Sequence, residues 1–220
     1  MNRTLRIEVA FDFICPWCLI GKRQLDRALA QLRSSHPQVQ VELVWQGVQL
    51  LPNIPTQGEP FAAFYLKRLG SPEAVRLRQA QVQQAAAAAG LEINLVGIER
   101  MPNTADAHRL LQLASAVATP AQCEALLERL FAAYFQRGED LGDRATLLAI
   151  AVSCGLAPSI VVDCLRGDAL PFFGAVSGAS GVPYFVIDRR FAVSGAQPAD
   201  VLLATLREAL AFGVAQGQPA

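Results

Sequence analysis

Residues 5–20 read LRIEVAFDFICPWCLI, and their hydrophobic period changes in the middle. Over Leu5–Phe13 apolar and polar side chains alternate and β-formers are frequent, so this half predicts a strand. From Pro16 onward apolar residues recur at three- and four-residue steps, which predicts a helix with proline in its first turn. The stretch therefore predicts a strand followed directly by a helix, with Cys15 at the helix start.

Cys15 and Cys18 stand three positions apart at this junction. A helix N-terminus favours an anion, and a Cys-x-x-Cys pair there lowers a thiol pKa from about 8.5 to roughly 3.5–7.5. In such a pair the first sulfur is the exposed nucleophile, and the second, one turn inside, attacks the mixed disulfide. We expect Cys15 to be the attacking thiolate and Cys18 the resolving thiol.

Two other interpretations of the pair are weaker. A structural zinc site needs about four nitrogen or sulfur ligands. The remaining candidates are scattered and form no second Cys-x-x-Cys pair: Cys123, Cys154, Cys164, His36 and His108. We therefore expect no metal. Two inert core cysteines are the other alternative, which leaves the strand–Cys-Pro-aromatic-Cys–helix arrangement unexplained.

The bulk properties exclude several classes of function. The chain has 220 residues with 19 basic and 19 acidic side chains, so no basic footprint for nucleic acid is expected. No apolar run reaches the ~18 residues of a membrane span. The residues after Met1 enter a strand without a separate secretory signal, which predicts a cytoplasmic protein. The high apolar content is compatible with a homodimer.

The pattern along the chain predicts an insertion. Val39–Trp45 alternates as a second strand, and helical patterns then follow one another from Glu59 to about Arg166. Strands return at Pro183–Ile187 and Phe191–Val193, and a last helix begins near Pro198. The prediction is an α/β thioredoxin fold with a large all-helical domain inserted. Residues 1–58 and 167–220 form the thioredoxin-like domain, and residues 59–166 form the helical domain.

Gly181-Val182-Pro183 opens the late strand. Proline is tolerated at the first position of a strand, and only about 5–6% of X-Pro bonds are cis in folded proteins. The residues by themselves therefore predict an ordinary trans proline at Pro183.

The sequence resembles the DsbA family, and most of all its FrnE-like cytosolic branch of thiol–disulfide oxidoreductases. The likeness rests on CPWCLIGK at residues 15–22, on Gly181-Val182-Pro183, and on VSGAQ at residues 193–197. In the helical segment it rests on PNTADAHRL at residues 102–110 and LFAAYF at residues 130–135. The match covers nearly the whole chain.

The resemblance implies a cis-proline at Pro183 facing Cys15, with the Val182 backbone offered to an extended substrate. It implies a disulfide oxidoreductase or isomerase that works through a redox-active Cys15–Cys18 disulfide, supported at the site by Pro16 and Trp17. No bound cofactor is implied. The implied substrates are proteins or small molecules with disulfides or thiols, with glutathione as a conceivable co-substrate.

A second hypothesis comes from the same superfamily. Kappa-class glutathione transferases and 2-hydroxychromene-2-carboxylate isomerases resemble this chain in layout, but they typically carry serine at the position of Cys15 and lack a resolving cysteine. They also tend to place an acidic residue near the start of the last helix, where this chain reads GAQPAD at residues 195–200. Two cysteines favour exchange over glutathione-dependent isomerisation. A redox-regulated binding protein is a third hypothesis, which no feature specifically supports.

Other polar residues have two interpretations each. Asp12, three residues before Cys15, could assist proton transfer to Cys18 or tune the pKa of that thiol, and it could equally be a turn or helix-capping carboxylate. His108 could carry a proton, but a surface histidine without a role is favoured. Asn103 and Thr104 are expected to cap the helix that follows them. The three remaining cysteines lie in apolar helical patterns and are predicted to be buried and inert.

Overall fold

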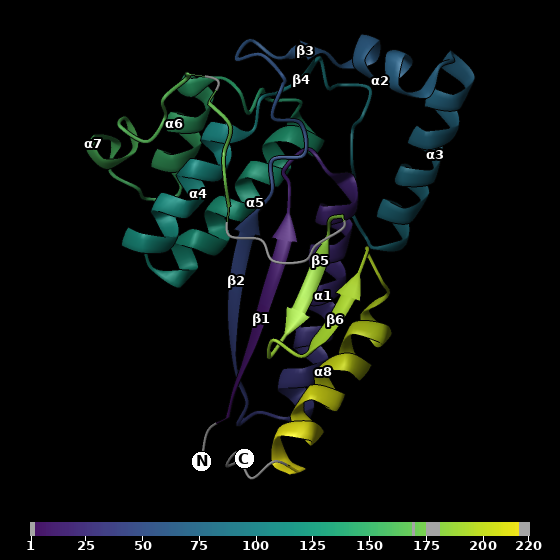
Figure 1. The fold of residues 1–220 in the computed structure, drawn as a ribbon, viewed down its shortest axis with the longest axis vertical. Coiled ribbons are helices and arrows are strands. Elements are labelled where there is room, and N and C mark those ends of the chain that lie inside the picture. Colours follow the sequence, from purple (N-terminus) through teal and green to yellow (C-terminus); the bar gives the residue numbers. More distant parts are fainter. Residues whose placement is uncertain (1–2, 169, 175–180, 216–220) are drawn as a thin grey trace. The chain divides into compact units, whose positions relative to one another are not determined.

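The computed structural model describes residues 3–168, 170–174 and 181–215 (Figure 1). The chain divides into two compact units, one made of Met1–Gly47 with Ala175–Ala220 and the other of Val48–Gly174. The sequence predicts the same kind of division but puts the boundaries after residues 58 and 166. In the structure residues 48–58 and 167–174 belong to the second, helical unit.

The first unit is built around a four-stranded mixed sheet of order β2-β1-β5-β6. Strand β1 is parallel to β2 and antiparallel to β5, and β5 is antiparallel to β6. The elements of this unit, in chain order, are β1 (Thr4–Phe11), α1 (Pro16–Ser35), β2 (Gln40–Gly47), β5 (Tyr184–Ile187), β6 (Phe191–Ser194) and α8 (Ala199–Ala215).

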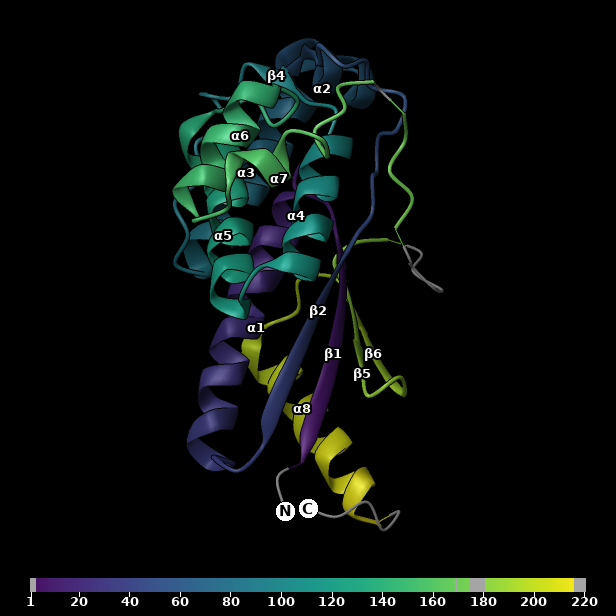
Figure 2. The same cartoon turned by 90° about the vertical axis from the view of Figure 1, so that its left-hand side faces the viewer.

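Both helices of this unit cover the same face of the sheet (Figures 1 and 2). Leu5, Ile7 and Val9 alternate along β1 and pack into one apolar cluster with Leu29 of α1 and Leu206 of α8. Because successive strand residues point to opposite faces, the alternation seen in the sequence becomes a buried face here. This packing fixes α1 against the sheet and so positions its N-terminus.

The two ends of the first unit are joined by a buried arginine. The Arg3 guanidinium donates to the carbonyl of Ala209 at 2.7 Å and to the carbonyl of Leu210. It also pairs with the Asp188 carboxylate at 3.2 Å, and that carboxylate accepts the Arg6 backbone N–H at 2.9 Å. The last turns of α8 and the β5–β6 turn are thereby held to β1.

The second unit is helical. Its elements are β3 (Glu59–Pro60), α2 (Phe61–Leu69), α3 (Pro72–Ala88), β4 (Arg100–Met101), α4 (Ala105–Val117), α5 (Pro120–Arg137), α6 (Arg144–Ser153) and α7 (Pro158–Val161). Helix starts carry the expected signals, because Ser71 and Asp143 accept N–H groups of the first turn and Thr119 forms a capping box with Gln122.

Two features of the helical unit differ from the sequence prediction. The two-residue strands β3 and β4 pair with each other, whereas no strand is predicted between residues 59 and 166. Such short strands show no period that a pattern could reveal. Helix α7 ends at Val161 instead of near residue 165. Among the described helices, none combines the length and the apolar character needed to cross a membrane.

Candidate functional site

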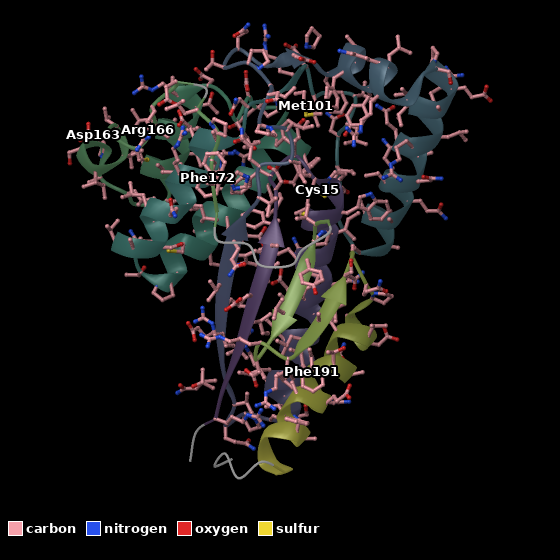
Figure 3. All side chains as sticks on the ribbon, viewed as in Figure 1. Cys15, Met101, Asp163, Arg166, Phe172 and Phe191 are labelled. Carbon is pink, nitrogen blue, oxygen red and sulfur yellow. The ribbon has the colours of Figure 1, made fainter. Side chains whose placement is uncertain are left out.

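Cys15 is the N-cap residue of α1, with φ −90° and ψ 107° (Figure 3). Its carbonyl accepts the Cys18 N–H at 3.0 Å. Pro16 occupies the first helical position, where a backbone N–H would have no partner within the helix. The turn before it is closed by the Cys15 N–H on the Asp12 carbonyl at 3.1 Å. The strand–helix junction predicted from the sequence therefore puts the Cys15 sulfur at the positive end of α1.

Both cysteines of the pair are free thiols in this structure. Cys15 is 8% exposed and Cys18 is 1% exposed. Cys15 is thus the more accessible of the two, although it is largely buried and not the open sulfur that the sequence predicts. Pro16 and Trp17, between the two cysteines, are half-buried.

The surroundings of the two thiols shift their pKa values in opposite directions. A hydrogen bond from the Cys18 thiol holds the pKa of Cys15 below its ordinary value, and the backbone N–H groups of Cys18 and Trp17 lower it further, against the effect of burial. Burial raises the pKa of Cys18 well above its ordinary value, and the hydrogen bond to Cys15 adds to this. One sulfur is prepared to be a thiolate and the other to keep its proton.

The segment just before β5, Val182 and Pro183, lies next to Cys15. The Cys15 Sγ atom lies 3.8 Å from the Val182 carbonyl oxygen, to which its thiol donates. The Val182–Pro183 peptide bond is cis, and the Pro183 carbonyl accepts the Gly195 N–H at 2.9 Å. Val182 and Pro183 are therefore brought beside the first cysteine by the pairing of β5 with β1 and β6.

Asp12 is fully buried next to the thiol pair. Its negative charge raises the pKa of both Cys15 and Cys18. Its Oδ1 atom accepts the Ile14 N–H at a long 3.5 Å, and α1 has no side-chain cap at its N-terminus. This long contact fits the turn interpretation of Asp12 and not the helix-capping one, and its role in proton transfer stays a prediction.

Gly21 contacts the site, although no role for it is predicted from the sequence. It is buried in α1 and lies directly against the ring of Pro183. The available signal is a glycine within an otherwise regular amphipathic helix, which costs stability unless a packing reason requires it.

His108 belongs to the helical unit. It is 2% exposed, and its ring stacks on Phe172 at a centroid distance of 5.1 Å. The favoured prediction of a surface histidine is wrong, because the side chain is buried and the ring of the distant residue Phe172 stacks on it. A role of His108 as proton carrier stays a prediction.

Asn103 caps α4, as one of the two residues predicted to do so. Its Oδ1 atom accepts the Ala105 N–H at 3.0 Å, while Thr104 makes no cap. The same side chain bonds Gln49 at 2.9 Å and the Ile54 carbonyl at 2.6 Å. Its side chain therefore links the start of α4 to the segment of residues 49–54 inside the helical unit.

Asp106 fixes the end of the helical unit and was not singled out by the sequence. Its carboxylate accepts the backbone N–H groups of Arg166 at 3.2 Å and Gly167 at 2.7 Å. Arg109 pairs with it at 2.6 Å and also donates to the Leu170 carbonyl at 2.5 Å. These hydrogen bonds compensate the burial of the Asp106 and Arg109 charges, so their burial has a structural explanation.

The other three cysteines, Cys123, Cys154 and Cys164, are half-buried rather than fully buried as predicted. Burial raises the pKa of Cys123 and Cys164, which disfavours their thiolates. Within the described part of the chain, no group of three histidine, cysteine or acidic side chains gathers as a metal site would require.

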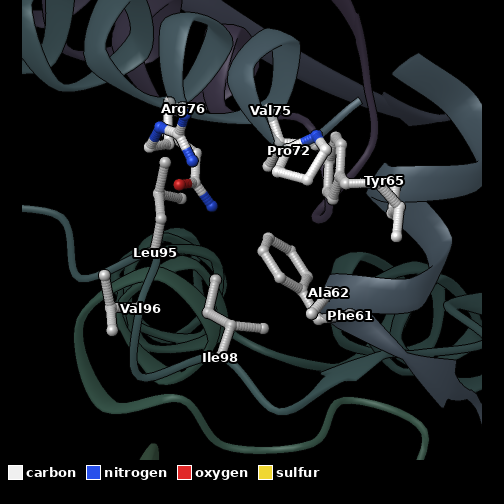
Figure 4. Close-up of a pocket in the computed structure, with 11 residues that line it drawn as sticks. Phe61, Ala62, Tyr65, Pro72, Val75, Arg76, Leu95, Val96 and Ile98 are labelled. Atoms are coloured by element: carbon white, nitrogen blue, oxygen red, sulfur yellow. The ribbon is translucent and has the colours of Figure 1, made fainter. Parts of the chain in front are cut away.

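A hollow of about 390 Å³ lies in the helical unit (Figure 4). Its walls are mostly apolar side chains of α2, α3 and residues 95–98, with Arg76 and Gln79 as the polar members. It contains no cysteine, histidine or carboxylate, so it offers none of the chemistry predicted from the sequence.

Residues 6–170 match the model of the DSBA-like thioredoxin domain. The chain belongs to the DsbA-like thioredoxin domain family. Its thioredoxin fold with a helical insertion, predicted from the sequence, is thereby confirmed, and it is a member of a family of oxidoreductases.

Three solved structures show how far the likeness extends. A probable DsbA oxidoreductase from Streptomyces coelicolor is 31% identical, with a TM-score of 0.79, covering 94% of this chain and 90% of that one. The cytosolic disulfide reductase DsbM from Pseudomonas aeruginosa, solved with GSH, is 18% identical, with a TM-score of 0.56, covering 97% and 100%. A 2-hydroxychromene-2-carboxylate isomerase is 13% identical, with a TM-score of 0.57, covering 96% and 97%. The last two share the fold.

Proposed function

We propose that this protein is a thiol–disulfide oxidoreductase of the FrnE-like branch that exchanges disulfides through Cys15 and Cys18. The observation that carries this proposal is the placement of the two thiols: Cys15 is the N-cap residue of α1 beside the Val182 carbonyl, and Cys18 is 1% exposed inside the first turn. The pKa of Cys15 is lowered at the N-terminus of α1, and that of Cys18 is raised beneath it. A nucleophile and a resolving group need this division of protonation states.

The reaction proceeds in two exchanges. The Cys15 thiolate attacks one sulfur of a substrate disulfide R–S–S–R′, so that a Cys15–S–S–R bond forms and R′–S⁻ leaves. Cys18 then loses its proton and attacks the Cys15 sulfur, which forms the Cys15–Cys18 disulfide and releases R–S⁻. The substrate gains two electrons and the enzyme dithiol loses them, and the reverse sequence oxidises a substrate dithiol.

Asp12 serves the second exchange. Cys18 is 1% exposed, so its proton needs an acceptor inside the protein. Asp12 is fully buried and close enough for its charge to raise the pKa of both thiols. We propose that its carboxylate takes the Cys18 proton, directly or through a water molecule.

The Val182 backbone positions the substrate. Its carbonyl oxygen lies 3.8 Å from the Cys15 sulfur. A substrate segment in extended conformation can pair with this backbone as an added strand, which places its own sulfur opposite Cys15. Such recognition reads the main chain, so it suits protein or peptide substrates of varied sequence.

The proposed substrates are proteins or small molecules that carry disulfides or thiols, and glutathione is the proposed small co-substrate. The proposed site of action is the cytoplasm, where a free dithiol is kept reduced and a Cys-x-x-Cys pair serves catalysis. No bound cofactor is needed, since both electrons reside in the two sulfurs.

Trapping of the mixed disulfide tests this function. The Cys18→Ser variant is mixed with a disulfide-bonded peptide, and the intact mass is measured with and without a later thiol wash. We expect one peptide per chain, attached at Cys15 and released by thiol, while the wild type holds no adduct and ends as the Cys15–Cys18 disulfide. The Cys15→Ser variant is the control and should hold no adduct at the site.

Two results would contradict the proposal. The first is an adduct that forms equally well in Cys15→Ser, because attack would then come from another cysteine. The second is a glutathione-dependent activity that survives Cys18→Ser together with saturable glutathione binding, which would identify a transferase or isomerase.

A further inference from the structure

The backbone of α1 packs against the Pro183 ring at Gly21. A Cβ atom built on Gly21 would stand 2.9 Å from Pro183 Cγ and 3.2 Å from Phe185 Cζ, with Pro183 Cβ at 3.4 Å. Carbon atoms in contact prefer about 3.5–4.0 Å, so two rings occupy the space that any side chain would need. Gly21 is therefore the point where the helix backbone touches the loop before β5.

Neither ring can move away alone. Phe185 is fully buried in the apolar cluster between the sheet and α8. Pro183 is buried, and its carbonyl is held by the Gly195 N–H at 2.9 Å on the side of β6. A group added at position 21 must therefore widen the separation between α1 and the segment of Val182 and Pro183.

Two contacts tie this loop to α1. One is the Pro183 ring on Gly21, and the other is the Val182 carbonyl, 3.8 Å from the Cys15 sulfur. Both lie on one helix, with Gly21 less than two turns beyond Cys15. The distance between the Pro183 ring and the Gly21 backbone therefore sets the distance between Val182 and Cys15.

We infer that Gly21 is a positioning residue that selects extended peptide disulfides as substrates. Because Gly21 has no side chain, the Pro183 ring can contact the helix backbone directly. This contact holds the Val182 backbone close to Cys15, so that a substrate strand paired with Val182 presents its sulfur to Cys15. The inference rests on the proposed disulfide exchange and adds the residue that sets its preference among disulfide substrates. A small disulfide without a peptide backbone cannot pair with Val182 and does not depend on this contact.

The Gly21→Ala variant tests the inference with two substrates. One is a disulfide-bonded peptide with several residues on each side of the cysteine, and the other is hydroxyethyl disulfide, which has no peptide backbone. The matched control is Gly181→Ala, which adds the same methyl group beside Val182 but meets no atom within 4 Å. Rates are measured for each reduced variant, together with the pH profile of Cys15 alkylation and thermal unfolding.

The expected result is a change in the ratio of the two activities. A displacement of about 1 Å at a reacting pair can cost on the order of a hundredfold, so kcat/KM of Gly21→Ala on the peptide should fall at least about tenfold, mainly through KM. Its rate with hydroxyethyl disulfide and its Cys15 alkylation rate at each pH should stay within about twofold of the wild type, because the Cys18 hydrogen bond and helix N-terminus that lower the Cys15 pKa are unchanged. Gly181→Ala should match the wild type on both substrates.

An equal loss on both substrates would overturn the inference, since it would show a general structural role. An unchanged ratio would overturn it as well. If Gly21→Ala is unstable, the double variant Gly21→Ala with Phe185→Leu removes one of the two rings in the way, and it must recover part of the peptide activity. A wild type that reacts with neither disulfide would contradict the proposed function itself, which separates the two failures.

Discussion

The Cys15 sulfur and the Val182 carbonyl oxygen lie 3.8 Å apart, although 167 positions separate the two residues in the chain. The sheet order brings them together, because β5 inserts beside β1 and delivers the Val182–Pro183 loop to the end of the sheet where α1 begins. A thiol at a helix N-terminus thus faces a backbone segment that can bind a strand.

The lowered pKa of Cys15 should depend on Cys18 as a hydrogen-bond donor. The Cys18 thiol is the largest cause of the lowering, so Cys18→Ala should raise the midpoint of the Cys15 alkylation profile. Cys18→Ser retains a donor and should keep the midpoint closer to that of the wild type. The rate of iodoacetamide labelling of Cys15 against pH measures both. Equal midpoints in the alanine and serine variants would contradict this account.

The reduced protein should lose stability in alkaline solution because of Cys18. The folded pKa of Cys18 is raised above the unfolded value of about 8.5, so its contribution is complete below that pH and is lost as the pH rises toward the folded pKa. Cys15 has the opposite sign, and its contribution is lost as the pH falls through its lowered pKa. Urea unfolding of the reduced wild type between pH 8 and 9.5 should show a decline that is smaller in Cys18→Ser. A parallel decline in both proteins would assign the effect to other groups.

Asp12→Asn should separate the two roles of this carboxylate. Its charge raises the pKa of both thiols, so its removal should move Cys15 alkylation to lower pH. As a proton acceptor for Cys18 it should also speed the second exchange, and proton transfer of this kind contributes about a hundredfold or more. Rapid-quench measurement of the mixed-disulfide lifetime should therefore show a longer life in Asp12→Asn. A lifetime equal to that of the wild type would leave Asp12 with an electrostatic role only.

Arg189→Gly should stabilise the β5–β6 hairpin. Asp188 and Arg189 have φ of 49° and 58°, the left-handed region that a tight hairpin turn of this kind requires. Asp188 is kept there by its bonds to Arg3 and Arg6, whereas Arg189 is exposed and gains nothing comparable. Glycine removes the Cβ strain and should add about 1 kcal/mol to the free energy of unfolding. Chemical denaturation should show a higher midpoint, and no gain is expected for the neighbouring Arg190→Gly, whose φ is not positive.

The local parts of the site could be predicted from the sequence because their signals are local. The alternation up to Phe13, the proline after Cys15 and the helical period beyond it suffice to place Cys15 at the N-cap of α1. The late strand at Tyr184–Ile187 was predicted in the same way. The fold class then follows from the order of these elements and from the family resemblance.

Other features could not be predicted because they depend on distant parts of the chain. The contact of Gly21 with Pro183 needs α1 to pack beside β5, which no window of sequence records. The burial of His108 depends on Phe172, a residue with no pattern relation to it. The charge of Asp12 acts on two sulfurs through space, and the spacing in the sequence leaves its role undecided.

The central claim is that Cys15 and Cys18 form a redox pair, and a redox titration tests it most directly. The protein is equilibrated in glutathione buffers of graded ratio, and the oxidised fraction is measured by quenching and mass analysis, with Cys15→Ser as control. The account predicts one reversible two-electron transition between Cys15–Cys18 dithiol and disulfide in the wild type, absent in Cys15→Ser. The absence of any such transition in the wild type, or an identical one in Cys15→Ser, would contradict it.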